Sequence, residues 1–167
     1  MQNLKITFLA SLMILLSACG WHLRGQVNLP VSLRILDLNV SAVDFVSQNA
    51  IKQSLLSNSV TISEDAQYQL KVIKEIADKR TLAVTSNAKA SEYELIQTLE
   101  FQVLDSNKEI ISETLSVTTY QTLLYDADAE IGKAQEEQNL RLEMKQANAY
   151  KILLRLKSLS LTPNQTK

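Results

Sequence analysis

The chain contains a single cysteine, Cys19, which lies at the end of a short apolar run near the amino terminus. The run covers residues 6–16 and follows one positive charge, Lys5. A segment of this length is too short to cross a bilayer as a helix, but it fits the hydrophobic region of a secretory signal. Because no second cysteine exists, no disulfide can form within the chain, and packing alone must hold the fold.

The four residues that end this segment, Leu16-Ser17-Ala18-Cys19, resemble the lipobox of bacterial lipoproteins. In that motif the cysteine is acylated and becomes the first residue of the mature chain. We therefore expect residues 1–18 to be a signal peptide that is removed, and Cys19 to be the lipid attachment site. The alternative is an ordinary signal peptide with an incidental cysteine. Gly20 at the next position, rather than aspartate, favours the periplasmic side of the outer membrane.

The composition argues against several classes of function. The chain has 17 basic and 18 acidic side chains, so no strong field attracts nucleic acid. The three glycines are scattered and form no phosphate-binding loop. His22 is the only histidine, three residues after Cys19, which makes a catalytic role improbable. With Cys19 acylated no thiol remains, so we expect no catalytic residue, no metal and no cofactor.

Hydrophobic periodicity predicts a single α+β domain over residues 33–161, between a lipidated linker at 19–32 and a flexible tail at 162–167. The pattern is clearest around residues 92–103, where apolar and polar side chains alternate. Ser41 and Asp44 resemble a capping box at a helix start. We expect strands at 33–40, 68–84, 92–103 and 109–125, helices at about 41–58 and 126–158, and a brief extended piece at 60–62. Asp126 or Asp128 is expected to cap the second helix.

This order, β-α-β-β-β-α, predicts a two-layer sandwich: a mostly antiparallel four-stranded sheet with both helices on one face. At about 45 Å the second helix is expected to be longer than the sheet it covers. Its first part, residues 130–139, is mostly polar, which suggests that these turns project from the sheet or meet another molecule.

One face of the strand predicted at 109–125 is polar but uncharged. Its side chains are those of Ser112, Thr114, Ser116, Thr118 and Thr122. Two interpretations remain open. Threonine suits any strand, so the pattern can reflect β-propensity alone. Alternatively, the face is buried against a polar protein surface such as the inside of a β-barrel.

The opening Cys-Gly-Trp-His-Leu-Arg at 19–24, Leu29-Pro30, and Ser91-Glu92-Tyr93 at the entry to a strand are similar to the LptE family of lipopolysaccharide-assembly lipoproteins. The resemblance covers nearly the whole mature chain. It implies that the protein plugs and helps to fold the outer-membrane barrel LptD, and that the pair delivers lipopolysaccharide to the outer leaflet.

The same resemblance implies that two basic residues contact lipopolysaccharide. Lys133 matches the position early in the second helix. The other position, in a turn between strands, falls near Ser86, which is not basic, so Lys89 or Arg80 from the same hairpin is the candidate substitute. An alternative role for Lys133 is pairing with Glu136 or Glu137 on a solvated helix face.

Two other functions remain as alternatives. A free-standing periplasmic lipid carrier would need an apolar cavity between sheet and helices, and lipid would co-purify with it. A serine hydrolase ranks far lower, since it would depend on His22.

Overall fold

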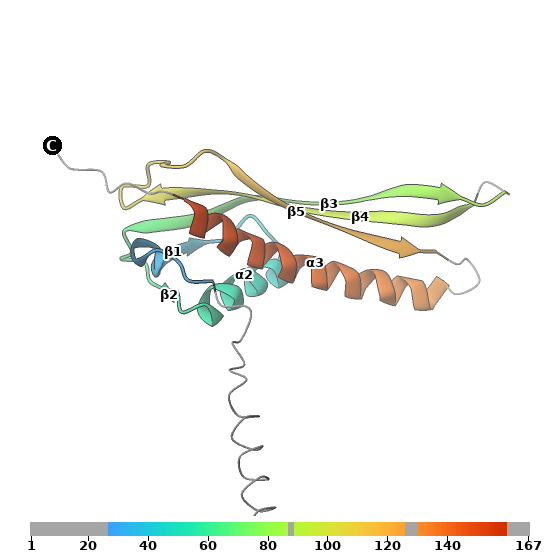
Figure 1. The fold of residues 1–167 in the computed structure, drawn as a ribbon, viewed down its shortest axis with the longest axis horizontal. Helices are drawn as coiled ribbons and strands as arrows, with labels where there is room; N and C mark the ends of the chain where they lie inside the picture. Colours follow the sequence, from blue (N-terminus) through green and yellow to red (C-terminus); the bar gives the residue numbers. More distant parts are fainter. Residues whose placement is uncertain (1–26, 87–88, 126–129, 160–167) are drawn as a thin grey trace, which may run out of the picture.

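The computed structural model describes residues 27–86, 89–125 and 130–159, which form two layers. A twisted sheet makes one layer, and both helices cover one of its faces (Figure 1). The elements are a short 3-10 helix η1 (Val31–Leu33), β1 (Ile35–Asn39), α2 (Phe45–Ser57), β2 (Thr61–Ile62), β3 (Tyr68–Val84), β4 (Ala90–Asp105), β5 (Leu115–Leu124) and α3 (Glu130–Ser158). The predicted α+β class with two helices on one face is confirmed.

The sheet has five strands in the order β2-β1-β3-β4-β5, one more than predicted. The additional strand is the brief extended piece, which pairs in parallel with β1 through Ile35 opposite Thr61 and Leu36 opposite Ile62. β1 also runs parallel to β3, whereas β3, β4 and β5 are antiparallel neighbours. A two-residue strand carries too few side chains for an alternating pattern to be recognised in sequence.

Asp44, rather than Ser41, caps α2. The Asp44 carboxylate accepts a hydrogen bond of 2.8 Å from the Ser47 backbone N–H, which satisfies a donor in the first turn. The Ser41 hydroxyl instead donates to Asn39 Oδ1 at 2.9 Å, in the connection before the helix. The prediction therefore placed the helix start a few residues too early, because Ser and Asp are both good capping residues.

The strands β3 and β4 are longer than the helix that packs on them, contrary to the prediction. β3 has 17 residues and spans about 56 Å, whereas the 29 residues of α3 span about 44 Å. A register shift near Ile73 lets β3 continue through a polar stretch as one strand. α3 therefore lies along the sheet for its whole length (Figure 1). The final strand is shorter than predicted, because residues 109–114 lie outside β5. Within this stretch Ile110 forms one isolated bridge to Leu104.

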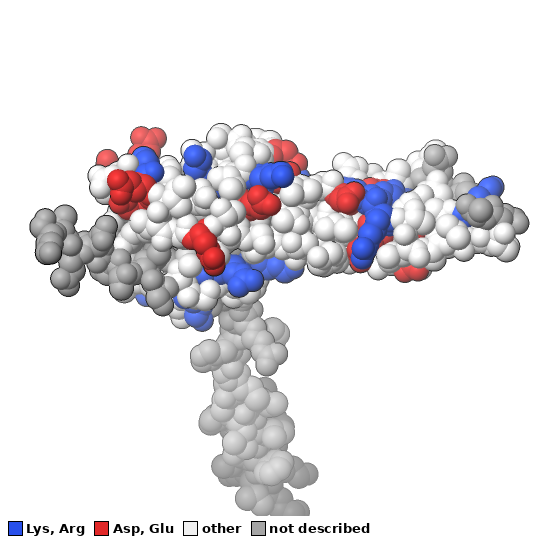
Figure 2. Space-filling view, turned by 90° about the horizontal axis from the view of Figure 1, so that it is seen from above, with Lys and Arg blue, Asp and Glu red and all other residues white. Residues whose placement is uncertain are grey.

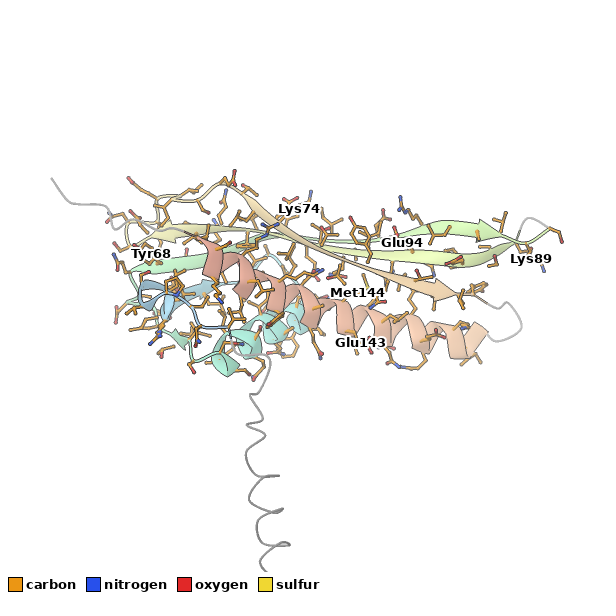
Figure 3. All side chains as sticks on the ribbon, viewed as in Figure 1. Tyr68, Lys74, Lys89, Glu94, Glu143 and Met144 are labelled. Carbon is orange, nitrogen blue, oxygen red and sulfur yellow. The ribbon has the colours of Figure 1, made fainter. Side chains whose placement is uncertain are left out.

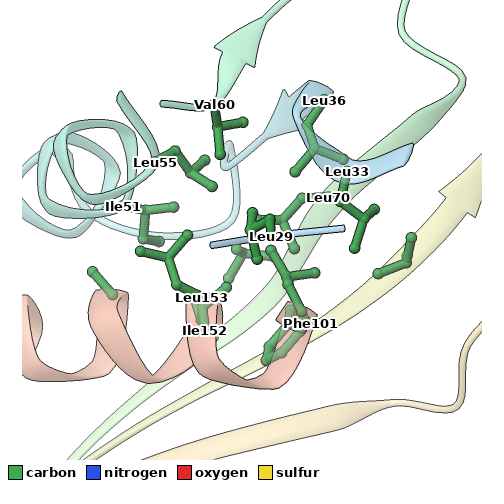
Figure 4. Close-up of a cluster of buried hydrophobic side chains, with 14 of the residues drawn as sticks. Leu29, Leu33, Leu36, Ile51, Leu55, Val60, Leu70, Phe101, Ile152 and Leu153 are labelled. Carbon is green, nitrogen blue, oxygen red and sulfur yellow. The ribbon is translucent and has the colours of Figure 1, made fainter. Parts of the chain in front are cut away.

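Two separate groups of buried apolar side chains fill the space between the layers. The larger group lies beneath α2 and the second half of α3 and includes Leu36, Ile51, Phe101 and Leu153 (Figure 4). Val27 and Leu29, from the segment predicted as linker, are also buried in this group. The smaller group, Leu95, Leu123 and Met144, joins the first half of α3 to the outer part of the hairpin. We call that outer part, with the first half of α3, the arm.

Two adjacent leucines of α3 test this packing. Leu153 is fully buried and Leu154 is 44% exposed. We expect Leu153→Ala to lower the free energy of unfolding by about 2–5 kcal/mol, because it leaves a cavity in the larger core. Leu154→Ala is the matched control and should cost less than about 1 kcal/mol. Urea unfolding followed by circular dichroism measures both, and equal losses would contradict the described orientation of α3.

Candidate functional site

The helices leave the opposite face of the sheet uncovered (Figure 1). On β5 this outer face carries Ser116, Thr118, Tyr120, Thr122 and Leu124, since Val117, Thr119 and Leu123 are buried beneath α3. The Thr118 hydroxyl lies 2.9 Å from that of Thr98 on β4. Ser116, Thr118 and Thr122 thus lie on the predicted polar face.

Two members of that predicted face, Ser112 and Thr114, precede β5. The Ser112 hydroxyl accepts a hydrogen bond of 2.9 Å from the Val103 backbone N–H. The face is also less polar than predicted, because Tyr120 and Leu124 are exposed there. Alternation along β5 requires both residues to share the face of the threonines.

The outer face of β3 and β4 is charged, in contrast to β5. Lys74 lies opposite Glu100, and Arg80 lies opposite Glu94. Seen from above the sheet, the surface shows scattered side chains of both signs and no large area of one sign (Figure 2). This surface therefore suits a polar protein partner better than a highly charged polymer.

An apolar patch lies in the middle of the outer face. Ile96 of β4 lies between Asp78 of β3 and Tyr120 of β5. In the next row, Thr98 of β4 lies between Ile76 of β3 and Thr118 of β5. Tyr120 is 59% exposed and Ile76 is also exposed. Exposed aromatic and aliphatic side chains within a polar surround resemble the centre of a protein interface.

A group of buried polar contacts, which we call the polar seam, separates the two cores. Its centre is the Lys145 ammonium of α3, which binds Asp44, lies 3.1 Å from the Ser47 hydroxyl and lies 2.9 Å from the Glu75 carboxylate. The side chains of Lys145 and Glu75 are each only 12% exposed. Burial would raise the pKa of Asp44, but Lys145 and the Ser47 N–H outweigh it, so this pKa lies below its ordinary value.

The polar seam continues across β4 and β5. The Gln97 side-chain amide donates to Glu75 at 2.6 Å, and the Gln97 backbone carbonyl accepts a 2.8 Å hydrogen bond from the Asn148 side chain. The Thr119 hydroxyl donates to Asn148 Oδ1 at 2.7 Å. Lys151 Nζ donates at 2.6 Å to the Thr118 carbonyl of the edge strand. These contacts fix the rotation of α3 and cover part of the β5 edge.

The three predicted lipopolysaccharide-contacting residues all lie on the arm. Lys89 is at the hairpin between β3 and β4, near the end of the molecule farthest from α2 (Figure 3), and its carbonyl accepts a 2.7 Å hydrogen bond from the Thr85 N–H. Lys133 pairs with Glu136 at 2.8 Å, one of the two partners foreseen for it. Arg80 Nε lies 2.6 Å from Glu94 Oε2.

These basic residues do not converge on one site. Lys79 faces α3, so its neighbour Arg80 must point to the outer face, whereas Lys133 belongs to the helical layer. The Arg80–Glu94 contact is close but lacks hydrogen-bond geometry, and Glu94 Oε2 has no hydrogen-bond partner among the described residues. Of the three, Lys89 alone makes no ion pair with any described residue.

Within the arm, a cluster that the sequence did not indicate fastens the first half of α3 to β3. Glu137 of α3 binds Lys79 at 2.5 Å and Arg141 at 2.7 Å. The Lys79 ammonium also lies 4.2 Å from the centre of the Tyr93 ring, a cation–π contact. Burial alone would raise the pKa of Glu137, but the two cations hold it below its ordinary value. The polar first part of α3 therefore pairs with the sheet and does not project from it.

The described ranges lack two further kinds of feature. No helix there is long and apolar enough to cross a membrane. Nor do these residues contain a cluster of acidic, histidine or cysteine side chains suited to a metal ion. Cys19 and His22 lie outside the described residues, as do Asp126 and Asp128, the residues predicted to cap the second helix.

The family model described as "LptE: Lipopolysaccharide-assembly" matches residues 35–156, which run from β1 almost to the end of α3. The chain belongs to the LptE family. It is 30% identical over 161 residues to the LPS-assembly lipoprotein LptE of Pectobacterium atrosepticum, covering 93% of this chain and 86% of that one. The LptE of Yersinia pestis is 29% identical over the same length, with 93% and 77% covered. The resemblance found in the sequence is thereby confirmed, and involvement in lipopolysaccharide assembly follows from it.

Solved structures share the LptE fold. A minor lipoprotein of Acinetobacter baumannii has a TM-score of 0.66 at 24% identity, covering 77% of this chain and 94% of that one. Lipoprotein B of Nitrosomonas europaea has a TM-score of 0.68 at 20% identity, covering 83% and 91%. At these identities the likeness concerns the fold alone.

The lowered pKa of Glu137 predicts how the arm responds to pH in this LptE-family protein. A carboxylate with a depressed folded-state pKa stabilises the fold above its unfolded pKa, and this contribution is lost as the pH falls through the folded value. We expect Lys79→Met to lower the free energy of unfolding at pH 7, and this difference to shrink as the pH falls below about 4.

Lys133→Met, which removes the pair with the more exposed carboxylate of Glu136, is the matched control and should change stability little at either pH. Urea unfolding from pH 7 to pH 3 measures both variants. A Lys79→Met difference that stayed constant over this range would contradict the ionic role of Glu137.

Proposed function

We propose that this protein is a lipid-anchored outer-membrane subunit that plugs an LptD-like β-barrel and helps the barrel to assemble. On this proposal the pair delivers lipopolysaccharide to the outer leaflet, and the protein itself performs no chemical reaction. The observation that carries the proposal is the family match over residues 35–156. Cys19 is its proposed lipid attachment site.

The shape and surface of the molecule support a role within a larger assembly. The sheet extends well beyond the main core as the arm (Figure 1). The outer face combines hydroxyl side chains, paired charges and the apolar patch around Tyr120. The inner wall of a β-barrel is polar, so a partner surface with interspersed hydroxyls and charges of both signs is complementary to it. The β5 edge carries the uncharged part of this surface.

A free-standing lipid carrier receives no support from the interior. Close-packed side chains from both helices and the sheet fill the space where acyl chains would have to lie (Figure 4). Leu33, Leu36, Phe101 and Leu153 are all essentially inaccessible to solvent. Opening a cavity large enough for lipid would require the helices to separate from the sheet, at the cost of the larger core.

Within this assembly we propose that basic residues of the arm contact lipopolysaccharide phosphates transiently. Lys89, Lys133 and Arg80 are the candidates. Lys133 and Arg80 each lie beside a carboxylate, and this carboxylate offsets their attraction for a phosphate. Lys89 lies at the hairpin, and no described acidic residue pairs with it. The contact therefore depends mainly on Lys89.

A charge placed on the outer face tests the plug. We expect Thr118→Lys to leave the isolated domain folded but to lower recovery of the complex with the barrel at least tenfold, equivalent to about 1.4 kcal/mol. The reason is that an unpaired ammonium would be buried against the barrel wall. The control is Gln53→Lys, which adds the same charge on the exposed side of α2. Undiminished recovery for Thr118→Lys would show that this face is not the interface.

The lipopolysaccharide contact has its own test. A photo-crosslinker at position 86, beside Lys89, should form adducts with lipopolysaccharide in the intact complex, and Lys89→Ala should lower their yield several-fold. Lys133→Ala and Arg80→Ala should have smaller effects, because each of those cations already has an acidic neighbour. Equal adduct yields for all three variants and the unchanged protein would contradict a specific contact at the arm.

A further inference from the structure

The edge of the sheet beside α2 is left open because β2 is so short. Pairing between β1 and β2 ends at Leu36 and Ile62, whereas β1 keeps pairing with β3 as far as Asn39 and Lys71. The Leu36 carbonyl accepts a 3.0 Å hydrogen bond from the Ser63 N–H on the open side. Because backbone groups alternate along a strand, Leu38 directs its N–H and C=O to the same side, beyond the end of β2. An extended segment can add there as a further strand.

Two grooves flank this open edge. The groove on the helix side, which we call the α2 groove, has a volume of about 370 Å³ and is lined mainly by Leu38, Val40, Phe45, Asn49, Lys52 and Ile62. Phe45, at the start of α2, is 75% exposed, which is unusual for a large aromatic side chain. The second groove, of about 520 Å³, shares Leu38, Val40 and Gln48 with the α2 groove. Its other residues are polar and include Asp37, Asn39, Glu64 and Lys108. A strand added at this edge would place alternate side chains into an apolar and a polar groove.

The chain itself contains a segment with this pattern. Residues 21–24 read Trp-His-Leu-Arg, so an extended conformation puts Trp21 and Leu23 on one side and His22 and Arg24 on the other. The apolar pair matches the α2 groove. The basic pair matches the polar groove, where Glu64 makes no ion pair with any described residue.

The length of the connection also fits. The first described residue, Val27, donates a 2.6 Å hydrogen bond from its N–H to Asn58 Oδ1, at the carboxyl end of α2. From Asn58 back to Phe45 the helix rises about 20 Å. The six residues from Val27 back to Trp21 also span about 20 Å when extended. Trp21 can therefore reach Phe45 while Leu23 lies beside Asn49 and Lys52.

We propose that residues 21–24 dock along the open edge of β1, antiparallel to that strand, with Trp21 and Leu23 in the α2 groove. The lipid on Cys19, two residues before Trp21, then leaves the domain beside Phe45 and not beside Val27. Docking thus fixes which end of the helical layer faces the membrane. This inference does not depend on the proposed plug role, because it concerns contacts within one chain.

Trp21 is the only tryptophan in the chain, so its fluorescence reports the docking directly. Acrylamide quenching of the Trp21 fluorescence is measured for two forms: the lipidated full-length protein in detergent, and a Cys19→Ser chain without lipid. Each form is measured folded and unfolded in guanidinium. We expect several-fold weaker quenching in the folded protein, in both forms. Phe45→Glu, which changes the groove, should restore most of the quenching seen in guanidinium. Leu23→Asp, which changes the docking segment, should do the same.

The control is Val46→Glu, which adds the same charge to the neighbouring residue, 42% exposed and outside the α2 groove. It should leave Trp21 shielded. Glutamate at either position lies in the first turn of α2, where the helix dipole favours a negative charge, and circular dichroism should show that both variants fold. Equal quenching of folded and unfolded chains would overturn the proposal, as would shielding that survives Phe45→Glu. Shielding lost on dilution would overturn it in favour of a second copy of the chain.

Discussion

The Lys145 ammonium is the contact on which the arrangement of the layers depends. It reaches from α3 to the N-cap of α2 at Asp44 and to Glu75 on β3, so one charge joins both helices to the sheet. A buried ammonium is costly unless it is paired and hydrogen-bonded, and here three oxygens surround it. Because these partners come from two elements, α2 and β3, only one placement of α3 satisfies them all. The polar seam thus supplies a specificity that close-packed leucines alone do not.

The polar seam also lets one helix serve two parts of the molecule. On one side of the polar seam lies the larger core, with α2 and the second half of α3. On the other side lies the smaller cluster of buried side chains, within the arm. Since that cluster has only three fully buried members, the arm relies on the Lys79–Glu137–Arg141 contacts as well. The result is a long sheet face supported from behind. An extended, supported face is what a subunit needs if it is to line another protein over much of its length.

Sequence reasoning recovered what hydrophobic periodicity controls and missed what depends on pairing. The alternation over residues 92–103 located β4, and the long helix predicted at about 126–158 matches α3. β2 escaped assignment as a strand because two residues carry no period. The polar seam left a trace that was not used: Gln97 stands between Leu95 and Leu99 on a buried face, and Asn148 stands in the apolar stripe of α3. Their partners are far away in the sequence, so only the fold could identify them. For the same reason the pairing of Lys74 with Glu100 on the outer face was not predicted.

The most direct test of the plug is to extract the tagged full-length protein from outer membranes in mild detergent and to identify what is recovered with it. The account predicts an equimolar complex with one much larger β-barrel protein, stable through size-exclusion chromatography. Recovery of the lipoprotein alone, under conditions in which both proteins are present and folded in the membrane, would contradict it.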